Sequence, residues 1–196
     1  WSFAHAVSVE GRNLTPVTED GTSTEHRNLV LTGFMGTGKS TIGRILAARL
    51  DYEFVDTDEL IEQRHGPIPQ IFRDHGEGEF RRLEREVADQ LAERDRLVIS
   101  TGGRMMVDAV NAARLGATGD VFCLTASVDT IVALVTADDS AAERPLLAGD
   151  DVHGAITRLL AERVEAYARF AQVATDHRTP NEVAAEIMDR TVNRSI

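Results

Sequence analysis

The sequence predicts an α/β fold in which helices cover both faces of a mostly parallel sheet. Short apolar runs alternate with segments of helical periodicity along most of the chain, a pattern typical of parallel strands joined by helical crossovers. Residues 33–41 also match a phosphate-binding loop, whose pattern requires a strand before it and a helix after it. With 196 residues, 42% of them hydrophobic, the chain is long enough for one domain with a substantial core.

The phosphate-binding loop carries the most specific chemistry. Its sequence, Gly33-Phe34-Met35-Gly36-Thr37-Gly38-Lys39-Ser40-Thr41, fits G-x-x-x-x-G-K-[ST]. The glycines let backbone N–H groups face an anion, Lys39 reaches the outer phosphates, and Ser40 offers its hydroxyl to Mg²⁺. The residues expected to contact nucleotide are Gly36, Thr37, Gly38, Lys39, Ser40 and Thr41. The alternative is an ordinary glycine-rich turn with a solvated lysine, but the flanking strand and helix favour the phosphate site.

Three strand–helix units are expected in the first part of the chain. Short apolar runs predict strands at Asn28–Thr32, Tyr52–Val55 and Leu97–Ser100. Helical patterns follow at Thr41–Leu50, then at Glu59–Arg64, Pro69–Asp74 and Glu79–Arg94, and finally at Val107–Leu115. Gly66-Pro67 and Gly76 separate the middle helices, since neither residue type favours a helix interior.

Two further units are expected after residue 120. Apolar runs predict strands at Val121–Leu124 and Gln172–Thr175. Helical patterns occur at Val128–Val135, at Val152–Ala171 as one long helix, and at Glu182–Arg190, the last preceded by a turn at Asp176–Pro180. Ala137–Gly149 is rich in small and polar residues, which predicts a mobile lid loop. Residues 1–27 are polar and interrupted by glycine and proline, so we expect a flexible N-terminal extension before a domain at 28–196.

The composition excludes several classes of protein. A net charge of −11 argues against a nucleic-acid partner, whose phosphates require a basic surface. Cys123 is the only cysteine, so the chain has neither an internal disulfide nor a zinc–cysteine cluster. It shows no apolar run of membrane-spanning length and no signal-peptide pattern, so we expect a cytoplasmic protein with no membrane partner.

Six segments along the chain carry motifs in a definite order. They are the loop and helix start Gly33–Gly43, the D-x-D element Asp56-Thr57-Asp58, the F-R-x-x-E element Phe80–Glu84, the start of a triple-glycine turn at Thr101-Gly102-Gly103, the lid motif Arg144-Pro145-Leu146-Leu147 and the late motif Arg163-x-x-x-Tyr167. Taken in this order, they resemble the motifs of the shikimate kinase family. The resemblance extends from about Leu29 to about Met188. It implies a three-layer P-loop kinase fold with a five-stranded parallel sheet of order 2-3-1-4-5. It also implies transfer of the γ-phosphoryl group of ATP to the 3-hydroxyl of shikimate.

The resemblance also assigns the acceptor side of the site. Asp58 would hold and deprotonate the accepting hydroxyl. Arg81 and Arg163 would grip the substrate carboxylate, and the planar fork of arginine suits that task better than lysine. Gly102 and Gly103 would line the pocket, with the N–H of Gly103 on a ring hydroxyl. The chemistry agrees, because a hydroxyl nucleophile needs a carboxylate within hydrogen-bond reach.

On the nucleotide side, Arg144 would close over the phosphates and Arg178 would lie by the adenine. Lys39 and Arg144 would neutralise charge on the migrating phosphoryl group. Ser40 is the expected Mg²⁺ ligand, with Asp56 acting through water. Asp56 and Asp58 follow a predicted strand, at the sheet edge where open α/β sheets bind ligands. The alternative is that these carboxylates only cap a helix.

Three other arginine and glutamate positions receive a different interpretation. Arg82 is interpreted as part of a solvated helix face, and Glu84 as a partner that orients an arginine. Arg104 occupies the place of the family's third glycine. Glycine there permits close approach or unusual φ, so Arg104 either changes the backbone or puts a large cation at the substrate pocket.

Three hypotheses about function follow. The first is a monomeric shikimate kinase that uses ATP and Mg²⁺ and acts on a small anionic hydroxy acid. The second is a kinase for another hydroxy acid or polyol such as gluconate, favoured if Arg104 reshapes the pocket. The third is a nucleotide-binding regulator without transfer activity, disfavoured because Lys39, Ser40, Asp58 and Arg144 are all present.

Overall fold

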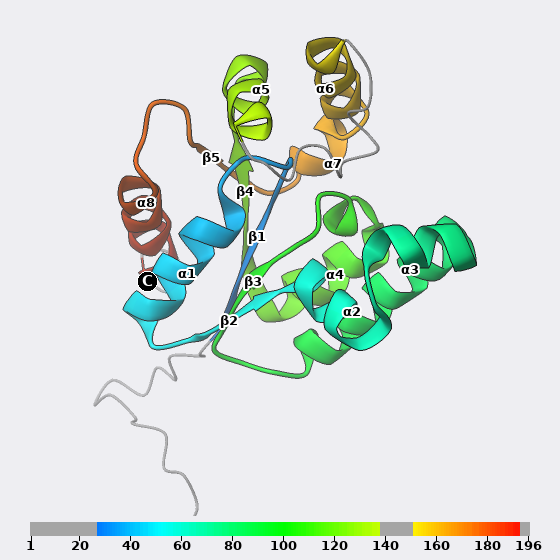
Figure 1. The fold of residues 1–196 in the computed structure, drawn as a ribbon. Coiled ribbons are helices and arrows are strands. Elements are labelled where there is room, and N and C mark those ends of the chain that lie inside the picture. The colour runs from blue at the N-terminus through cyan, green and yellow to red at the C-terminus, as the bar shows by residue number, and fades with distance from the viewer. Residues whose placement is uncertain (1–26, 138–150, 193–196) are drawn as a thin grey trace, which may run out of the picture.

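The computed structural model describes residues 27–137 and 151–192. Its centre is a parallel sheet of five strands in the order β2-β3-β1-β4-β5, which confirms the predicted order. The strands are β1 (Asn28–Gly33), β2 (Glu53–Asp56), β3 (Leu97–Ser100), β4 (Gly119–Thr125) and β5 (Ala171–Ala174). Figure 1 shows the sheet between two layers of helices. The carboxyl ends of β1, β3 and β4 therefore meet along one edge of the sheet.

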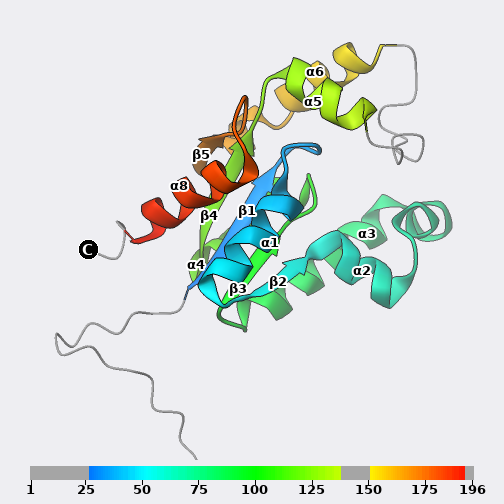
Figure 2. The same cartoon turned by 60° about the vertical axis from the view of Figure 1, so that its left-hand side comes forward.

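The helices fall into three groups. The described helices are α1 (Lys39–Leu50), α2 (Thr57–His65), α3 (Ile68–Ala92), the short 3₁₀ helix η1 (Met105–Val107), α4 (Ala109–Thr118), α5 (Val128–Thr136), α6 (Val152–Ala161), α7 (Val164–Tyr167) and α8 (Pro180–Val192). α1 and α8 pack together on one face of the sheet, and α3 and α4 on the other (Figure 2). α5 and α6 lie beyond the carboxyl ends of the strands (Figure 1).

Strand β1 is buried on both faces. Leu29 and Leu31 belong to a cluster that includes Leu46 of α1, whereas Val30 faces the opposite cluster with Leu83 of α3. Because successive side chains of a strand point to opposite sides, a strand covered on both faces is apolar along a continuous run, here Leu29, Val30 and Leu31. This explains why the short apolar run before the phosphate-binding loop could be predicted as a central strand.

The structure corrects one predicted helix. The segment Val152–Ala171 was predicted as a single helix, but α6 ends at Ala161 and the short α7 holds only Val164–Tyr167. Arg163, with φ −112° and ψ −6°, marks the break. The break places Arg163 and Tyr167 against the carbonyl of Gly103, to which both side chains donate hydrogen bonds. A tertiary contact with a distant turn therefore overrides the local helical pattern.

Helix α3 also contains a break, at Gly76, and the sequence predicted this one. Gly76 has φ 81° and ψ 173° inside α3, so two helical segments meet there at an angle. Glycine adopts this conformation without the steric cost that a Cβ would add.

Two predicted segments fall outside the described residues. They are the N-terminal extension before residue 27 and the lid beyond Ala137, which includes Arg144. Among the helices described, none is long and apolar enough to cross a membrane.

Candidate active site

Left-handed glycines shape the loop between β1 and α1. Gly36 has φ 78° and Gly38 has φ 84°, values that residues with a Cβ rarely adopt. At Gly33, φ is 135° and a Cβ would overlap the carbonyl oxygen of Leu124 on β4. The loop thus requires glycine at all three positions, and it delivers Lys39 to the first turn of α1. The open N-terminus of that helix is suited to an anion.

Lys39 is held inside this loop. Its Nζ donates to the carbonyl oxygen of Phe34 at 2.9 Å, and the hydroxyl of Thr37 donates to the same oxygen at 2.8 Å. Burial lowers the pKa of Lys39, while the nearby carboxylates of Asp58 and Asp56 oppose that shift. The ammonium group is therefore poorly solvated and close to acids, a setting in which an added phosphate would be stabilised strongly.

Two cavities meet at Lys39 and Ser40. The first, of about 510 Å³, is lined by the loop together with Thr130, Thr175 and Arg178. The second, of about 430 Å³, is lined by residues that include Asp58, Arg81 and Arg163. Among the described residues, only Lys39 and Ser40 line both. A group bound in one cavity can therefore meet a group bound in the other at the end of the Lys39 side chain.

Ser40 and Asp56 form the expected metal position. The Ser40 hydroxyl donates to Oδ2 of Asp56 at 2.9 Å, and the hydroxyl oxygen of Ser100 lies 3.4 Å from it. Asp56 also caps α2, because its Oδ1 accepts from the N–H groups of Asp58 and Glu59. The capping alternative is therefore confirmed for Asp56, whose other carboxylate oxygen faces Ser40.

The donor set suits Mg²⁺ bound jointly with phosphate. The described residues contain no group of three or more His, Cys, Asp or Glu side chains able to hold a metal unaided. Mg²⁺ usually keeps several waters and takes one or two protein oxygens together with substrate phosphates. A hydroxyl and a carboxylate beside a phosphate-binding loop match that preference.

Asp58 is a carboxylate aimed at the second cavity. Its Oδ1 is buried and has no hydrogen-bond partner among the described residues. Burial raises the pKa of Asp58 from 3.8 to about 6, reinforced by the charges of Asp56 and Glu84 and opposed by Lys39. A buried acceptor oxygen without a donor is costly. This oxygen lies against Gly102, while the Asp58 side chain as a whole lines the second cavity, where a hydroxy acid could meet its carboxylate.

Gly102 supplies the space that Asp58 occupies. A Cβ at Gly102 would overlap Oδ1 of Asp58. The N–H of Gly102 donates to the hydroxyl oxygen of Thr57 at 2.9 Å, which holds the turn after β3 against the start of α2. Glycine is therefore needed at position 102 because the Asp58 carboxylate approaches it closely.

We expect Gly102→Ala to lower kcat by tenfold or more while changing stability little. The added methyl group would turn the Asp58 carboxylate away, and misplacing a reacting group by about 1 Å can cost about 10²-fold in rate. The matched control is Gly78→Ala, because Gly78 lies within α3, a Cβ there would meet nothing within 4 Å, and alanine favours a helix. Steady-state kinetics and thermal unfolding check both variants. A kcat within twofold of wild type for Gly102→Ala would contradict the steric role.

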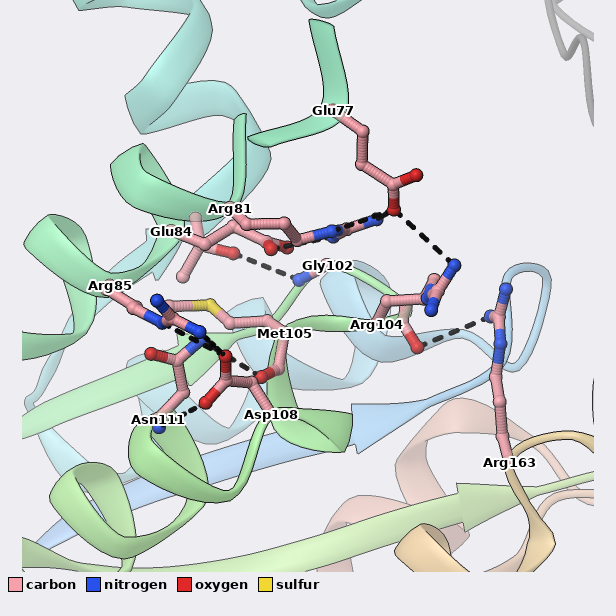
Figure 3. A network of polar contacts seen from close by, with 12 residues as sticks. Glu77, Arg81, Glu84, Arg85, Gly102, Arg104, Met105, Asp108, Asn111 and Arg163 are labelled. Carbon is pink, nitrogen blue, oxygen red and sulfur yellow. Dashed lines mark hydrogen bonds and ion pairs between the residues drawn. The ribbon is translucent and has the colours of Figure 1, made fainter. Parts of the chain in front are cut away.

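The arginines of the second cavity are placed by acids and by packing (Figure 3). Arg81 donates from Nη1 to Oε2 of Glu84 at 2.6 Å, and Glu84 is only 2% exposed, which confirms that Glu84 orients an arginine. Arg163 is 4% exposed, stacks its guanidinium on the ring of Phe34 at 5.0 Å and donates to the carbonyl of Gly103 at 3.3 Å. Both guanidinium groups line the same cavity.

Two other arginines differ from these in exposure. Arg82 is 57% exposed and pairs with Glu79 and Glu86, as expected for a solvated helix face. Arg104 has φ −114° and ψ −7°, which any L-residue adopts, so it replaces glycine without backbone strain. Its side chain is half exposed at the border of the second cavity and lies 3.5 Å from Glu77. Arg104 was expected either to change the backbone or to put a large cation at the substrate pocket. The structure shows the second outcome.

Arg178 lies on the first cavity, where the sequence expectation put a nucleotide base. Its guanidinium donates to the carbonyl oxygens of Ala174 at 3.0 Å and Glu182 at 3.1 Å, and it also pairs with Glu186. These contacts fix the side chain between β5 and the start of α8.

Ser100, Thr57 and Glu77 are among the residues of the site that were not predicted. Ser100 lies beside Ser40, and the hydroxyl of Thr57 accepts a hydrogen bond from the N–H of Gly102. Because each contact joins residues that are far apart in the sequence, no local pattern could have indicated it. Glu77, which accepts from Arg81, could have been found. It stands four residues before Arg81, the spacing at which oppositely charged side chains meet on a helix.

Comparisons with known proteins agree with this geometry. A family model described as "Shikimate kinase" matches residues 35–192. A shikimate kinase of Symbiobacterium thermophilum is 41% identical over 170 residues, which cover 85% of this chain and 97% of that protein. One from Caldicellulosiruptor bescii is 40% identical over 162 residues, covering 82% and 92% respectively. The solved structure of the Acinetobacter baumannii shikimate kinase in complex with shikimate has a TM-score of 0.79 at 33% identity, covering 86% of this chain and 94% of that one.

Proposed function

Because the chain belongs to the shikimate kinase family, we propose that it transfers the γ-phosphoryl group of ATP to the 3-hydroxyl of shikimate. The observation that carries the proposal is the meeting of two cavities at Lys39 and Ser40. The first cavity has a phosphate-binding loop, and the second is lined by the carboxylate side chain of Asp58. The γ-phosphate of ATP and the hydroxyl of the acceptor would thus meet beside Lys39, which can neutralise the negative charge of the phosphate.

The residues of the second cavity can hold and activate a hydroxy acid. Asp58 accepts the hydrogen bond of the attacking hydroxyl and takes its proton as the oxygen bonds to phosphorus. Arg81 and Arg163 bind the acceptor carboxylate, while Gly102 and Gly103 keep the turn close to the ring. Holding both reactants in line supplies much of the rate enhancement in such transfers.

The nucleotide side supplies charge neutralisation. Lys39 and the N–H groups of the loop bind the β- and γ-phosphates, and Lys39 follows the phosphoryl group as it moves. Ser40, and Asp56 through water, would hold Mg²⁺, which shields the phosphate oxygens when bound. We assign Arg144 to closing over the phosphates and Arg178 to the adenine. We also propose that the protein acts as a monomer in the cytoplasm, without nucleic-acid or membrane partners.

A coupled ADP-release assay with shikimate, quinate, gluconate or no acceptor tests the proposal. We expect ADP release that depends on shikimate, with at most weak release for the other three conditions. The product should carry phosphate on the 3-hydroxyl, as phosphorus NMR of the isolated product would establish. Faster release with gluconate than with shikimate would favour the second hypothesis. Nucleotide binding without acceptor-dependent release would favour a regulator.

Arg81→Ala should raise the KM for shikimate about ten- to a hundredfold and leave the KM for ATP nearly unchanged. The reason is that truncating a charge-assisted contact typically costs about 1.5–3 kcal/mol. The matched control is Arg82→Ala, which removes an exposed guanidinium from the next position of the same helix. Steady-state kinetics with each substrate varied in turn separate the two effects. An effect of Arg81→Ala confined to ATP would remove Arg81 from the acceptor site.

A further inference from the structure

Glu77 stands between two arginines of the second cavity. Its Oε1 accepts from Nε of Arg81 at 3.1 Å and from Nη2 of Arg81 at 2.9 Å. The same oxygen lies 3.5 Å from Nη1 of Arg104, so one carboxylate links a residue of α3 to the turn after β3 (Figure 3). Both arginines hold the pKa of Glu77 below its usual range, with Arg81 the larger influence. Glu77 is therefore ionised at neutral pH.

The contact with Glu77 occupies the part of Arg81 that an acceptor would use. A carboxylate binds a guanidinium best through two N–H groups on one edge. On Arg81, Nη1 is held by the buried Glu84, and the Nε–Nη2 edge is held by Glu77. An acceptor carboxylate that binds Arg81 bidentately through this edge must therefore displace Glu77.

The charges in contact with Arg81 are those of Glu77 and Glu84, and Arg104 is the second cation that Glu77 faces. Once displaced, Glu77 would need another cation, and Arg104 is the only one besides Arg81 that pairs with it among the described residues.

Glu77 is also free to move. Its side chain is 54% exposed and that of Arg104 is 49% exposed, so neither is locked by packing. Glu77 lies between Gly76 and Gly78, and a Cβ at either glycine would meet nothing within 4 Å. The Glu77 carboxylate is therefore largely exposed, and it already lies 3.5 Å from Arg104, so an exchange requires only a short displacement.

We propose that Glu77 and Arg104 exchange partners when the acceptor binds. The acceptor carboxylate takes the Nε–Nη2 edge of Arg81, and Glu77 leaves that edge and pairs with Arg104 alone. Arg104 is thus a positioning residue that stabilises the displaced glutamate and need not touch the acceptor. The proposal rests on the function proposed above, since it requires an acceptor with a carboxylate.

A double-mutant cycle tests the exchange with four proteins: wild type, Arg104→Ala, Glu77→Gln and the double variant. Arg104→Ala should raise the KM and the calorimetric Kd for shikimate about two- to fivefold, the effect of a half-exposed ion pair, with kcat and the KM for ATP unchanged. Glu77→Gln should lower the shikimate KM by a similar factor. In the Glu77→Gln background, Arg104→Ala should then leave the KM for shikimate unchanged. The conservative variant Arg104→Lys, made in wild type, should keep the wild-type KM because it keeps the positive charge.

The control pair is Arg82→Ala and Glu79→Gln, which removes an exposed ion pair from the same helix outside the cavity. An equal effect of Arg104→Ala in both backgrounds would overturn the exchange and make Arg104 a direct ligand of the acceptor. No effect in the wild-type background would overturn it as well. Failure of the proposed function would be distinct from either result, because wild type itself would then neither bind nor phosphorylate shikimate.

Discussion

Lys39→Ala is expected to lower kcat by about 10²- to 10³-fold or more, the usual cost of removing a preorganised group that stabilises transition-state charge. Lys39 is the cation common to both cavities, so no other described residue is placed to follow the phosphoryl group. Stability should not fall, since burial already disfavours the charged form of this side chain. Rapid-quench measurement of phosphoryl transfer, together with a thermal unfolding curve, checks both statements.

The control for this prediction is Arg44→Ala. Arg44 lies on the same helix, pairs with Glu59 at 3.1 Å and is 58% exposed, so its loss should leave kcat within about twofold. Turnover by Lys39→Ala close to that of wild type would remove the kinase mechanism described above.

Asp58→Asn is expected to reduce kcat by about 10²- to 10⁴-fold, the range associated with loss of a general base. Asparagine keeps the shape of the side chain but cannot take the proton of the attacking hydroxyl. ATP binding, measured by calorimetry, should remain near that of wild type. Retention of most of the activity would mean that the proton leaves by another route.

The same substitution should change stability in a pH-dependent way. Burial raises the folded-state pKa of Asp58 to about 6, so the ionised form is disfavoured in the folded protein. The contribution of Asp58 to stability therefore falls as the pH rises from about 4 to about 6, and the asparagine variant lacks this loss. Above pH 6 the variant should be more stable by about 1–3 kcal/mol, and below pH 4 the difference should vanish. Urea unfolding at pH 4, 5, 7 and 8 gives the comparison, and equal curves at pH 7 would contradict the burial cost.

Local pattern alone predicted the strands and most of the helices of this chain. β3 was predicted with its observed bounds, because a fully buried strand is a short and continuous apolar run. The order of the strands came instead from the family resemblance, since periodicity carries no information on which strands are neighbours. The break at Arg163 was missed for a related reason: the Gly103 carbonyl that holds it lies 60 residues away.

Some parts of the site could likewise be predicted from local sequence, whereas others depend on contacts between distant residues. The loop from Gly33 to Ser40 was predictable because its conformation and chemistry reside in one continuous segment. Arg104 was identified as a departure, but its consequence could not be predicted from the sequence. Its backbone angles proved ordinary, and its partner is Glu77 on another element. Contacts between residues that are far apart in the sequence, such as Ser40 and Ser100, cannot be predicted from the spacing of residues along the chain.

The central position of β1 has a consequence for how the protein can vary. Besides the phosphate-binding loop and α1, the first cavity, which we assign to nucleotide, is lined by α5, the turn after β5 and α8. The second cavity, which we assign to the acceptor, is lined mainly by α2, α3 and the turn after β3. Because only Lys39 and Ser40 line both, substitutions on opposite sides of β1 share few partners and should combine additively. Single substitutions in the second cavity should therefore be able to change the preference for the acceptor without changing the affinity for ATP. Arg104, which stands in the place of the family's third glycine, is a substitution on the acceptor side alone.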